Sequence, residues 1–573
     1  MIMKLRLCTA LEAVAGGLRV ALVEREDFAA GTSSRSTKLV HGGVRYLEKA
    51  VKQLDWGQFK LVFEALHERG ALLRNVPYMA TELPIMTPCY SWWEVPYYWA
   101  GMKLYDLVAG SQALHWSYYL PPSKSRAAFP TMSERRADGR RLRGTIVYYD
   151  GQFNDARLAV TLACTSALAG ATVLNHAAAV SLLKDSQGRV CGAEVADTLQ
   201  EENAEWARGW PRSPNARAKG TTKVYAKVVI NATGPFADGV RSLSAPEGAP
   251  MIQPSSGVHV TLPDYYSPEG VGLIVPKTKD GRVVFMLPWL GHTIAGTTDA
   301  EAEASMRPQA REEEIQFILD SIAEYLTVRV RRSDVMSAWS GIRPLAVDPH
   351  AQDTAGVSRD HVVTVGPDNL VTVAGGKWTT YRLMAEDAID TAILAGSADS
   401  KGANSTETMA QRAGRCATHD LRLIGASGWY PALFTEVAQT YRVPHRPGAI
   451  DTRVAQYLVR SYGDRAPEVT QIAEDRKLGH RVVQGYPILE AEVVYACRQE
   501  YCETPEDFIA RRTRLAFLDK RATLQSLPKI VELMAQEKGW SSKRAKHELQ
   551  RAADFVATFD SVEHPITEAQ ATA

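Results

Sequence analysis

Two apolar runs predict a parallel sheet in the first half of the chain. Residues 18–27 read LRVALVERED, and 227–238 read KVVINATGPFAD, a run that breaks at Gly234 and Pro235 before a helix. Continuous apolar runs of this kind are typical of strands that are buried on both faces. Glu24 stands at the carboxyl end of the first run, where a dinucleotide-binding fold places an acid that binds ribose hydroxyls.

Alternating apolar and polar positions predict antiparallel strands further along the chain. The alternation is clearest at 281–299, and it returns at 362–374 on either side of a turn. Helical spacing at 49–75 predicts one surface-packed helix, another helix follows the glycine pair at 375–376, and most of 411–560 is helical in pattern. The polar stretch 197–222 predicts a surface excursion from a hairpin, and the Gly, Ser and Thr residues of 396–410 predict a linker.

Composition narrows the class of protein. The chain has 573 residues with 66 Lys and Arg against 65 Asp and Glu, and 45% of its residues are hydrophobic. These values indicate a globular protein of several domains, and the near-neutral charge argues against nucleic acid as a partner. Its seven cysteines include no C-x-x-C pair, so we expect neither a disulfide framework nor a metal site. The sequence shows no recognisable targeting peptide and predicts no membrane-spanning helix.

An aromatic stretch at 92–111 permits two interpretations. It reads WWEVPYYWAGMKLYDLVAGS, and Glu94, Pro96, Lys103 and Asp106 interrupt its apolar character. Its Trp and Tyr content suits the headgroup region of a membrane, where amphipathic rings settle. An aromatic core or a pocket wall is the alternative.

The densest chemical signal is GTSSRSTKLVHGGVRYLE at 31–48. The amides of Gly42 and Gly43 can approach a planar or phosphorylated ligand closely, because no Cβ intervenes. The hydroxyls of Thr32, Ser33 and Ser36 suit cofactor phosphates. Arg45 suits bidentate binding of a phosphate.

Several motifs in one order carry a family resemblance. They are the 31–48 motif, YYDGQFNDARLAV (148–160), NATGPFAD (231–238), IAGTTD (294–299), SGIRPL (340–345), AGGKWTTYR (374–382) and RRTRLAFLD (511–519). In this order the chain resembles the FAD-dependent glycerol-3-phosphate dehydrogenases, with the membrane-associated mitochondrial type most similar. The resemblance extends from about residue 10 to about residue 555.

The resemblance implies an α/β fold class. It divides the chain into a Rossmann-like FAD-binding domain (1–80, 148–245 and 346–395), a helical and aromatic insertion (81–147), an antiparallel substrate domain (246–345), a linker (396–410) and an all-α C-terminal domain (411–560). The implied reaction oxidises sn-glycerol 3-phosphate to dihydroxyacetone phosphate and passes electrons through FAD to a quinone. It also implies peripheral membrane contact at the mitochondrial inner membrane, and a homodimer is compatible with the sequence.

The resemblance further implies a set of site residues. His259 is the first candidate for the base that takes the hydroxyl proton, Lys377 is the second, and Arg343 completes the catalytic set. Substrate binding falls to Arg45, Tyr46, Arg343, Arg359 and Thr379. Cofactor binding falls to Glu24, Thr32, Ser33, Ser36, Lys38, Leu39, His41, Gly42, Gly43, Ala232, Thr233, Gly234, Gly375, Gly376, Lys377 and Trp378.

The first residues depart from the family pattern. Counting back from LEAVAGGLRVALVE, the four glycines of the phosphate-binding motif would fall at Met1, Met3, Arg6 and Cys8. We therefore expect an FAD domain that lacks its first strand and glycine loop. Either these residues lie upstream of the given sequence, or the chain is a short form that binds FAD poorly.

Two alternatives to the quinone-linked dehydrogenase stay open at this point. A soluble glycerol-3-phosphate oxidase would pass electrons to oxygen and release hydrogen peroxide. A non-catalytic paralogue would lack flavin and turnover altogether.

Overall fold

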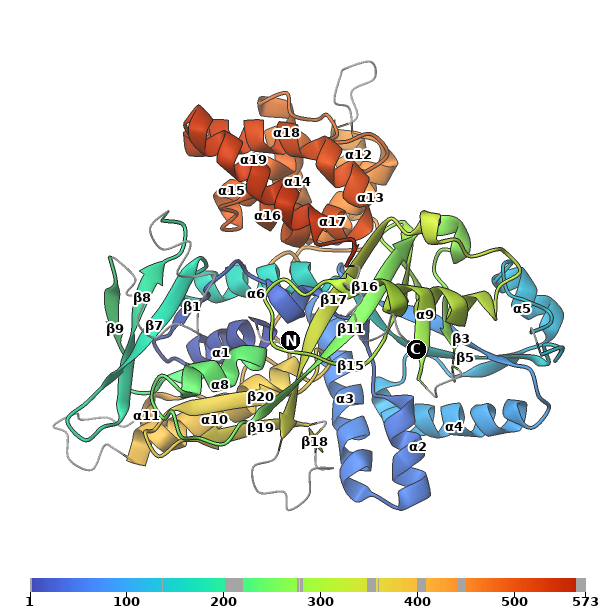
Figure 1. The fold of residues 1–573 in the computed structure, drawn as a ribbon, viewed down its shortest axis with the longest axis horizontal. Coiled ribbons are helices and arrows are strands. Elements are labelled where there is room, and N and C mark those ends of the chain that lie inside the picture. The colour runs from blue at the N-terminus through green and yellow to red at the C-terminus, as the bar shows by residue number, and fades with distance from the viewer. Residues whose placement is uncertain are drawn as a thin grey trace, which may run out of the picture.

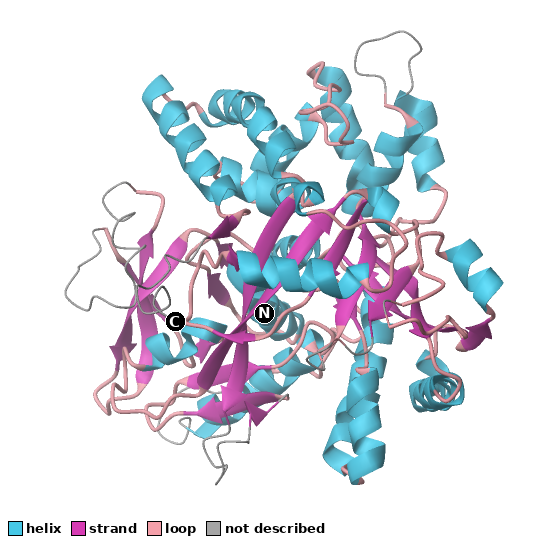
Figure 2. Ribbon diagram, turned by 45° about the vertical axis from the view of Figure 1, so that its right-hand side comes forward, coloured by secondary structure: helices cyan, strands magenta, loops and turns pink. Residues whose placement is uncertain are grey.

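The computed structural model describes residues 3–136, 138–200, 220–275, 278, 282–347, 357–358, 360–398, 409–441 and 450–562. Sheets cross the middle of the molecule, and the C-terminal helices form a separate layer on one side of them (Figures 1 and 2). The opposite side carries a projecting helical hairpin (Figure 1).

Short parallel strands form the core of the predicted Rossmann-like region. Strand β1 (Ala21–Val23) pairs in parallel with β6 (Thr172–Leu174), and β10 (Ile230–Asn231) pairs in parallel with β20 (Val371–Gly375). Both parallel strands that the apolar runs predicted are therefore confirmed. The helices that pack around them are α1 (Met3–Ala15), α6 (Asp155–Leu168) and α10 (Tyr381–Ala398). Positions 3, 6 and 8, where family glycines would fall, lie within α1.

A large and mostly antiparallel sheet forms the second unit. Its strands are β17 (Ser337–Val347), β11 (Ile252–Leu262), β14 (His292–Gly296), β13 (Val284–Trp289), β12 (Gly272–Val275), β3 (Ala80–Cys89), β5 (Gly144–Phe153) and β2 (Leu39–Val40), in spatial order after the edge strand β18 (Val357–Ser358). The parallel contact between β12 and β3 joins the two halves. The predicted insertion at 81–147 therefore begins and ends within this sheet, and α4 (Glu94–Ala109), β4 (Tyr118–Leu120) and α5 (Pro122–Ala128) occupy its middle.

The prediction of a single helix at 49–75 is wrong. The chain forms α2 (Val44–Gln53) and α3 (Trp56–Asn75), which pack together as the projecting hairpin (Figure 1). Leu54 adopts a left-handed conformation with φ of 52°, and the Asp55 side chain then accepts hydrogen bonds from the amides of Gly57 and Gln58. Apolar spacing continues across this break, so the pattern alone did not reveal it.

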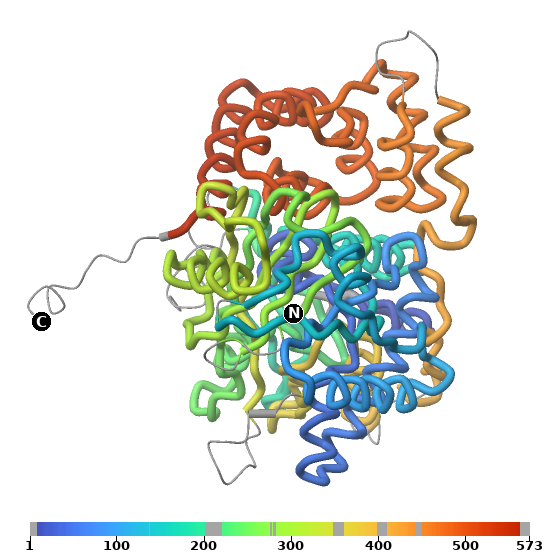
Figure 3. The backbone as a smooth tube through the Cα atoms, turned by 90° about the vertical axis from the view of Figure 1, so that its right-hand side faces the viewer, coloured from blue at the N-terminus to red at the C-terminus, as the bar shows by residue number. Residues whose placement is uncertain are grey.

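The helices expected in the C-terminal region are confirmed, and they share a buried core with the large sheet. These helices include α12 (Leu433–Tyr441), α13 (Thr452–Tyr462), α14 (Ala466–Asp475), α15 (Glu490–Gln499), α16 (Pro505–Asp507), α17 (Leu515–Leu518), α18 (Lys520–Lys538) and α19 (Ser542–Ala557). Figure 3 shows them stacked over the rest of the chain. Phe508 and Phe517 belong to one buried cluster with Trp289 and Trp339 of the sheet, so both units exclude water together.

A small antiparallel sheet lies at the edge of the molecule. Strands β7 (Ala177–Lys184), β8 (Val190–Asp197) and β9 (Thr222–Tyr225) form it. The pairing of β8 with β9 confirms that 197–222 leaves from a hairpin, while 201–219 lie outside the described residues. Most of the expected linker, 399–408, lies outside them as well.

Candidate active site

The loop that begins with η1 (Gly31–Ser34) is joined to the segment after β20 by two side chains. The indole Nε1 of Trp378 donates to the Ser33 carbonyl at 3.0 Å. The backbone amide of His41 donates to Thr379 Oγ1 at 3.1 Å. These bonds bring together two motifs that lie far apart in sequence and that both carry predicted cofactor contacts.

Strand β17 holds the same loop from a second direction. Thr32 Oγ1 donates to the Ile342 carbonyl at 2.5 Å, and an Arg35 guanidinium nitrogen donates to the Ser340 carbonyl at 2.8 Å. A Cβ on Gly341 would lie 2.8 Å from the Arg35 Cβ. The SGIRPL motif therefore needs its glycine for close packing on this loop.

The two glycine turns meet at a lysine and a tyrosine. Lys377 Nζ lies 3.8 Å from the centre of the Tyr46 ring, a cation–π contact. The Tyr46 ring covers Gly43, whose φ of 84° is left-handed and where a Cβ would lie 2.3 Å from the ring. Gly376 is also left-handed, with φ of 77°. Two motifs predicted to face the cofactor thus meet through Lys377, which follows Gly376, and the Tyr46 ring, which covers Gly43.

A fully buried ion cluster fixes the middle of the loop. Lys38 Nζ lies 2.6 Å from Asp155 Oδ2, and an Arg514 nitrogen lies 3.3 Å from Asp155 Oδ1. Burial lowers the pKa of Lys38 to about 7, against the opposing charge of Asp155. The Ser36 hydroxyl also donates to Asp155, at 2.8 Å. Lys38 and Ser36 therefore hold the loop through protein contacts, and their predicted contact with the cofactor stays a prediction.

Sequence reasoning did not single out Asp155 or Arg514 as site-supporting residues. Both lie inside motifs that carried the family resemblance, and Asp155 begins α6 directly after β5. A charged residue in the first turn of an apolar helix is a weak signal by itself, because helices favour acids there.

His259 projects from β11 into a buried aromatic and polar environment. Its ring stacks on Trp339 at 4.4 Å, and Nε2 lies 3.0 Å from Thr37 Oγ1. Nδ1 has no hydrogen-bond partner among the described residues. Burial, and then the charges of Lys38 and Arg343, hold the pKa of His259 well below its usual value. His259 is therefore neutral at physiological pH, with one ring nitrogen available.

Arg343 projects from β17 with its guanidinium held in place. Its nitrogens donate to Thr297 Oγ1, to the Thr298 carbonyl and to the Ser256 carbonyl, each at 2.9 Å. Asp299 completes the set with an ion pair of 3.1 Å. The side chain is 31% exposed, so the oriented cation keeps an open face.

The remaining predicted site residues lie in several separate elements. Glu24 is buried at the end of β1, where its carboxylate accepts from the amide of Glu26 at 3.1 Å. The Thr233 hydroxyl donates to the Asn231 side chain at 2.7 Å, in the turn that also contains Ala232 and Gly234. Leu39 is buried in β2, and Arg45 is exposed on α2. Arg359 lies outside the described residues.

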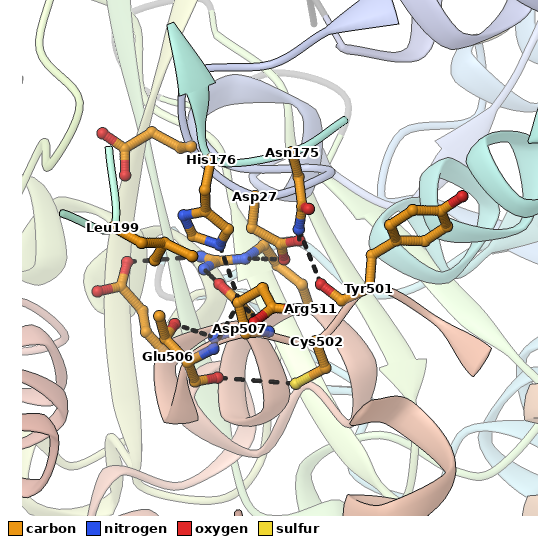
Figure 4. A network of polar contacts seen from close by, with 12 residues as sticks. Asp27, Asn175, His176, Leu199, Tyr501, Cys502, Glu506, Asp507 and Arg511 are labelled. Carbon is orange, nitrogen blue, oxygen red and sulfur yellow. Dashed lines mark hydrogen bonds and ion pairs between the residues drawn. The ribbon is translucent and has the colours of Figure 1, made fainter. Parts of the chain in front are cut away.

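A second buried network links β1 to the C-terminal region (Figure 4). Asp27, His176 and Asp507 place potential metal ligands within 4.8 Å of one another. Arg511 donates to both carboxylates at 2.7 Å, and Arg512 pairs with Asp27 at 2.6 Å. Two guanidinium groups supply the positive charge, so the cluster acts as an ion network between domains.

Comparison with known proteins agrees with this geometry. Residues 7–387 match the family described as FAD dependent oxidoreductase, and 416–545 match the C-terminal domain of alpha-glycerophosphate oxidase. A mitochondrial glycerol-3-phosphate dehydrogenase of Arabidopsis thaliana is 54% identical over 96% of this chain and 84% of its own length. This chain belongs to the FAD-dependent glycerol-3-phosphate dehydrogenase family. The human member is 46% identical over 96% of this chain and 71% of its own length.

A solved structure of the family supports the fold. The glycerol-3-phosphate dehydrogenase of Bacillus halodurans complexed with FAD superposes with a TM-score of 0.71 at 26% identity, covering 97% of this chain and 94% of that one. The described residues fit FAD: a buried carboxylate ends β1, and left-handed glycines open the turns at 43 and 375–376.

Proposed function

We propose that this chain oxidises sn-glycerol 3-phosphate to dihydroxyacetone phosphate with FAD and passes the electrons to a membrane quinone. The observation that carries the proposal is that a neutral histidine and a lysine that follows a glycine pair both contact the 31–46 loop, through Thr37 and Tyr46. The oriented guanidinium of Arg343 lies close enough to that histidine to lower its pKa. A phosphorylated secondary alcohol needs such a combination: a cation for its phosphate and an acceptor for its hydroxyl proton.

The chain's own residues would hold the cofactor in the following way. Glu24 at the end of β1 suits the ribose hydroxyls, and the glycine turns at 42–43 and 375–376 let the backbone approach a ligand closely. The Gly42 amide itself donates to the Tyr105 hydroxyl at 2.7 Å, which fixes the first of these turns. Trp378 and Thr379 keep these turns in position through Ser33 and His41. FAD, when bound, accepts the hydride that leaves carbon 2 of the substrate.

Substrate orientation falls to the cations beside the 31–46 loop. Arg343 binds the phosphate in the proposal, because four protein acceptors already fix its guanidinium and little freedom is lost on binding. Tyr46 and Thr379 line the approach, and Arg45 adds positive charge. Substrate binding by Arg359, which lies outside the described residues, stays a prediction.

In the proposal, His259 accepts the proton of the substrate hydroxyl. A neutral imidazole accepts a proton, and the buried Nδ1 has no hydrogen-bond partner among the described residues. Stacking on Trp339 and the contact with Thr37 hold the ring in one orientation. Lys377 is the second candidate, and paired variants described in the Discussion separate the two.

A direct assay tests the proposed function. Purified protein with measured flavin content should reduce a short-chain quinone analogue only when sn-glycerol 3-phosphate is present, and dihydroxyacetone phosphate should appear in equal amount. Peroxide release that matches substrate consumption would instead favour the oxidase alternative. A flavin-loaded preparation without either product would contradict the proposal.

The membrane-facing surface extends the proposal. Trp92, Trp93 and Trp99 are 67%, 62% and 46% exposed, so the interpretation of 92–111 as a core is wrong for these tryptophans. Trp116, just beyond this stretch, is 58% exposed. The guanidinium of Arg143 lies 4.8 Å from the Trp92 ring, and Lys103 Nζ lies 5.0 Å from the Trp116 ring. Aromatic rings beside basic groups suit an interface with anionic headgroups.

The α2–α3 hairpin extends the same surface. Its tip exposes Leu54 and Trp56, and Tyr97 of α4 donates to Glu48 of α2 at 2.8 Å. The hairpin and α4 both lie at the end of the molecule opposite the C-terminal helices (Figures 1 and 3). Among the described residues, no helix is both long and apolar enough to cross a bilayer.

This surface would meet the mitochondrial inner membrane in the proposal, where a quinone acceptor is available. Flotation with vesicles that contain cardiolipin tests it. The double variant Trp92→Ser and Trp93→Ser should lose at least half of the bound fraction, while Trp540→Ser on the C-terminal helical side should bind normally. Equal vesicle-bound fractions for the wild type and both variants would contradict the assignment of this surface to membrane binding. Homodimer formation stays a prediction.

A further inference from the structure

The last turn of α15 folds back on itself. The amides of Glu500 and Cys502 both donate to the Ala496 carbonyl, at 3.1 and 3.2 Å. Tyr501 between them adopts a left-handed conformation with φ of 55°, which is uncommon for a residue with a large side chain. This turn brings Cys502 beside Cys497.

The two side chains lie beside each other but differ in exposure. Both cysteines are free, and the Cys502 amide that donates to the Ala496 carbonyl places Cys502 next to the residue that precedes Cys497. Cys502 is fully buried, and its Sγ also lies 3.7 Å from the Thr504 carbonyl (Figure 4). Cys497 is half-buried and lines a cavity of about 350 Å³ between α6 and the C-terminal helices.

The surroundings give the thiols different chemistry. The neighbouring Cys502 side chain and the charge of Lys538 lower the pKa of Cys497, although burial opposes them. Burial raises the pKa of Cys502 well above its usual value. The accessible thiol is therefore the nucleophile, and the buried thiol beside it keeps its proton.

We propose that Cys497 and Cys502 form a peroxide-sensitive dithiol–disulfide pair. The Cys497 thiolate attacks one oxygen of hydrogen peroxide, the O–O bond breaks, and a sulfenic acid and hydroxide form. The Cys502 sulfur then attacks the Cys497 sulfur, and the S–O bond breaks as the disulfide forms. Two thiols and one peroxide thus yield one disulfide and two waters. The inference does not depend on the proposed dehydrogenase activity.

The position of the pair links it to the interdomain network. Arg512 donates to the Glu500 carbonyl in this turn at 2.6 Å and pairs with Asp27 after β1. Thr504 caps α16, whose Asp507 pairs with His176. A change of covalent state at Cys502 therefore acts on the segment that joins the C-terminal helices to β1.

Peptide mapping tests the proposal on the folded, full-length protein. The sequence places tryptic sites at Arg481, Arg498 and Arg511, so Cys497 and Cys502 fall in separate peptides, 482–498 and 499–511. After brief treatment with hydrogen peroxide and blocking of free thiols, the two peptides should appear as one disulfide-linked species that dithiothreitol separates. Matched untreated protein should show both peptides with blocked thiols.

Three variants make the result decisive. Cys416→Ser removes an exposed thiol elsewhere and should keep the linked species. Cys502→Ser should instead accumulate a sulfenic acid at Cys497 that dimedone traps. In Cys497→Ser, Cys502 should oxidise about tenfold more slowly than Cys497 does in the wild type. A linked species between Cys497 and Cys164, which lines the same cavity, would overturn the proposal, as would irreversible oxidation of Cys497 without any linked species.

Discussion

Trp378 and Ser33 are joined by a hydrogen bond of 3.0 Å, although 345 residues separate them in sequence. The bond is buried, and the Trp378 ring also packs edge-on against Phe153 of β5 with centroids 5.3 Å apart. The glycine turn at 375–376 is therefore placed against the 31–46 loop by one indole. This contact holds together two separate motifs that carry predicted cofactor contacts.

Loss of the Trp378 indole N–H should weaken flavin binding. A buried hydrogen bond contributes about 1 kcal/mol, so Trp378→Phe should raise the FAD dissociation constant about fivefold. Fluorescence titration of FAD into flavin-depleted protein measures the effect. Trp116→Phe, which changes an exposed tryptophan, is the control and should bind FAD like the wild type. Equal affinities for both variants would contradict the role given to Trp378.

Replacement of His259 should reduce turnover more than substrate binding. His259→Gln keeps a polar side chain but removes the base, so kcat should fall by about 10²–10⁴ while KM changes little. Steady-state kinetics with a quinone analogue measures this, and His67→Gln on the exposed side of α3 is the control. If Lys377→Met abolishes turnover while His259→Gln remains active, the base is Lys377.

Gly296 should tolerate no side chain, because it faces His259 across the β11–β14 pairing. A Cβ at this position would lie 2.4 Å from His259 Cδ2. Gly296→Ala should therefore displace the imidazole and lower kcat by about 10²-fold, since small misplacements of a reacting group are costly. Gly101→Ala, where nothing lies within 4 Å of the new Cβ, should have normal activity. Retention of wild-type kcat by Gly296→Ala would argue against a positioned His259.

The stability contributed by His176 should decline with rising pH. Burial alone would lower the pKa of His176, but the charge of Asp507 and its hydrogen bond outweigh burial and raise the pKa to about 9. The folded state thus binds a proton that the unfolded chain releases near pH 6.5. The contribution is complete below pH 6.5 and falls by about 3 kcal/mol as pH rises through 9.

Urea unfolding between pH 6 and 9.5 checks this sign. His176→Gln should be much less stable than the wild type at pH 6, and the difference should narrow toward pH 9.5. His115→Gln, which removes an exposed partner of Glu82, should show a small difference at every pH. A His176→Gln deficit that grows with pH would refute the assignment.

The Arg157–Glu500 pair should matter far more than a surface pair. Two buried hydrogen bonds of 2.7 Å join the side chains, and the guanidinium lies 4.5 Å from the Tyr462 ring. Arg157→Met leaves the buried Glu500 carboxylate with only a long 3.9 Å ion pair to Arg512, so the free energy of unfolding should fall by about 3–5 kcal/mol. Lys52→Met breaks an exposed pair with Glu48 and should cost about 1 kcal/mol or less. Comparable losses for the two variants would show that the Arg157 pair is weakly coupled to folding.

The local sequence pattern was enough to predict those elements whose burial is recorded in their own residues. The apolar runs around Leu22 and Ile230 predicted parallel strands, because a strand covered on both faces must be apolar throughout. The motifs around Gly43 and Gly376 were recognisable because left-handed turns restrict the residue type. Motif order alone was enough to indicate the family, and the comparisons confirm it.

Contacts between distant segments were decided only by the tertiary structure. Nothing in the local sequence shows that Asp155 pairs with both Lys38 and Arg514, or that β3 joins β12 to make one large sheet. The sequence pattern also did not predict the helix break at Leu54, because the apolar spacing continues across it. Periodicity records which face of an element is buried but not what covers that face. The sequence by itself therefore determined the strands, the glycine turns and the family, while packing between distant segments decided which charges are paired and which nitrogen of His259 stays available.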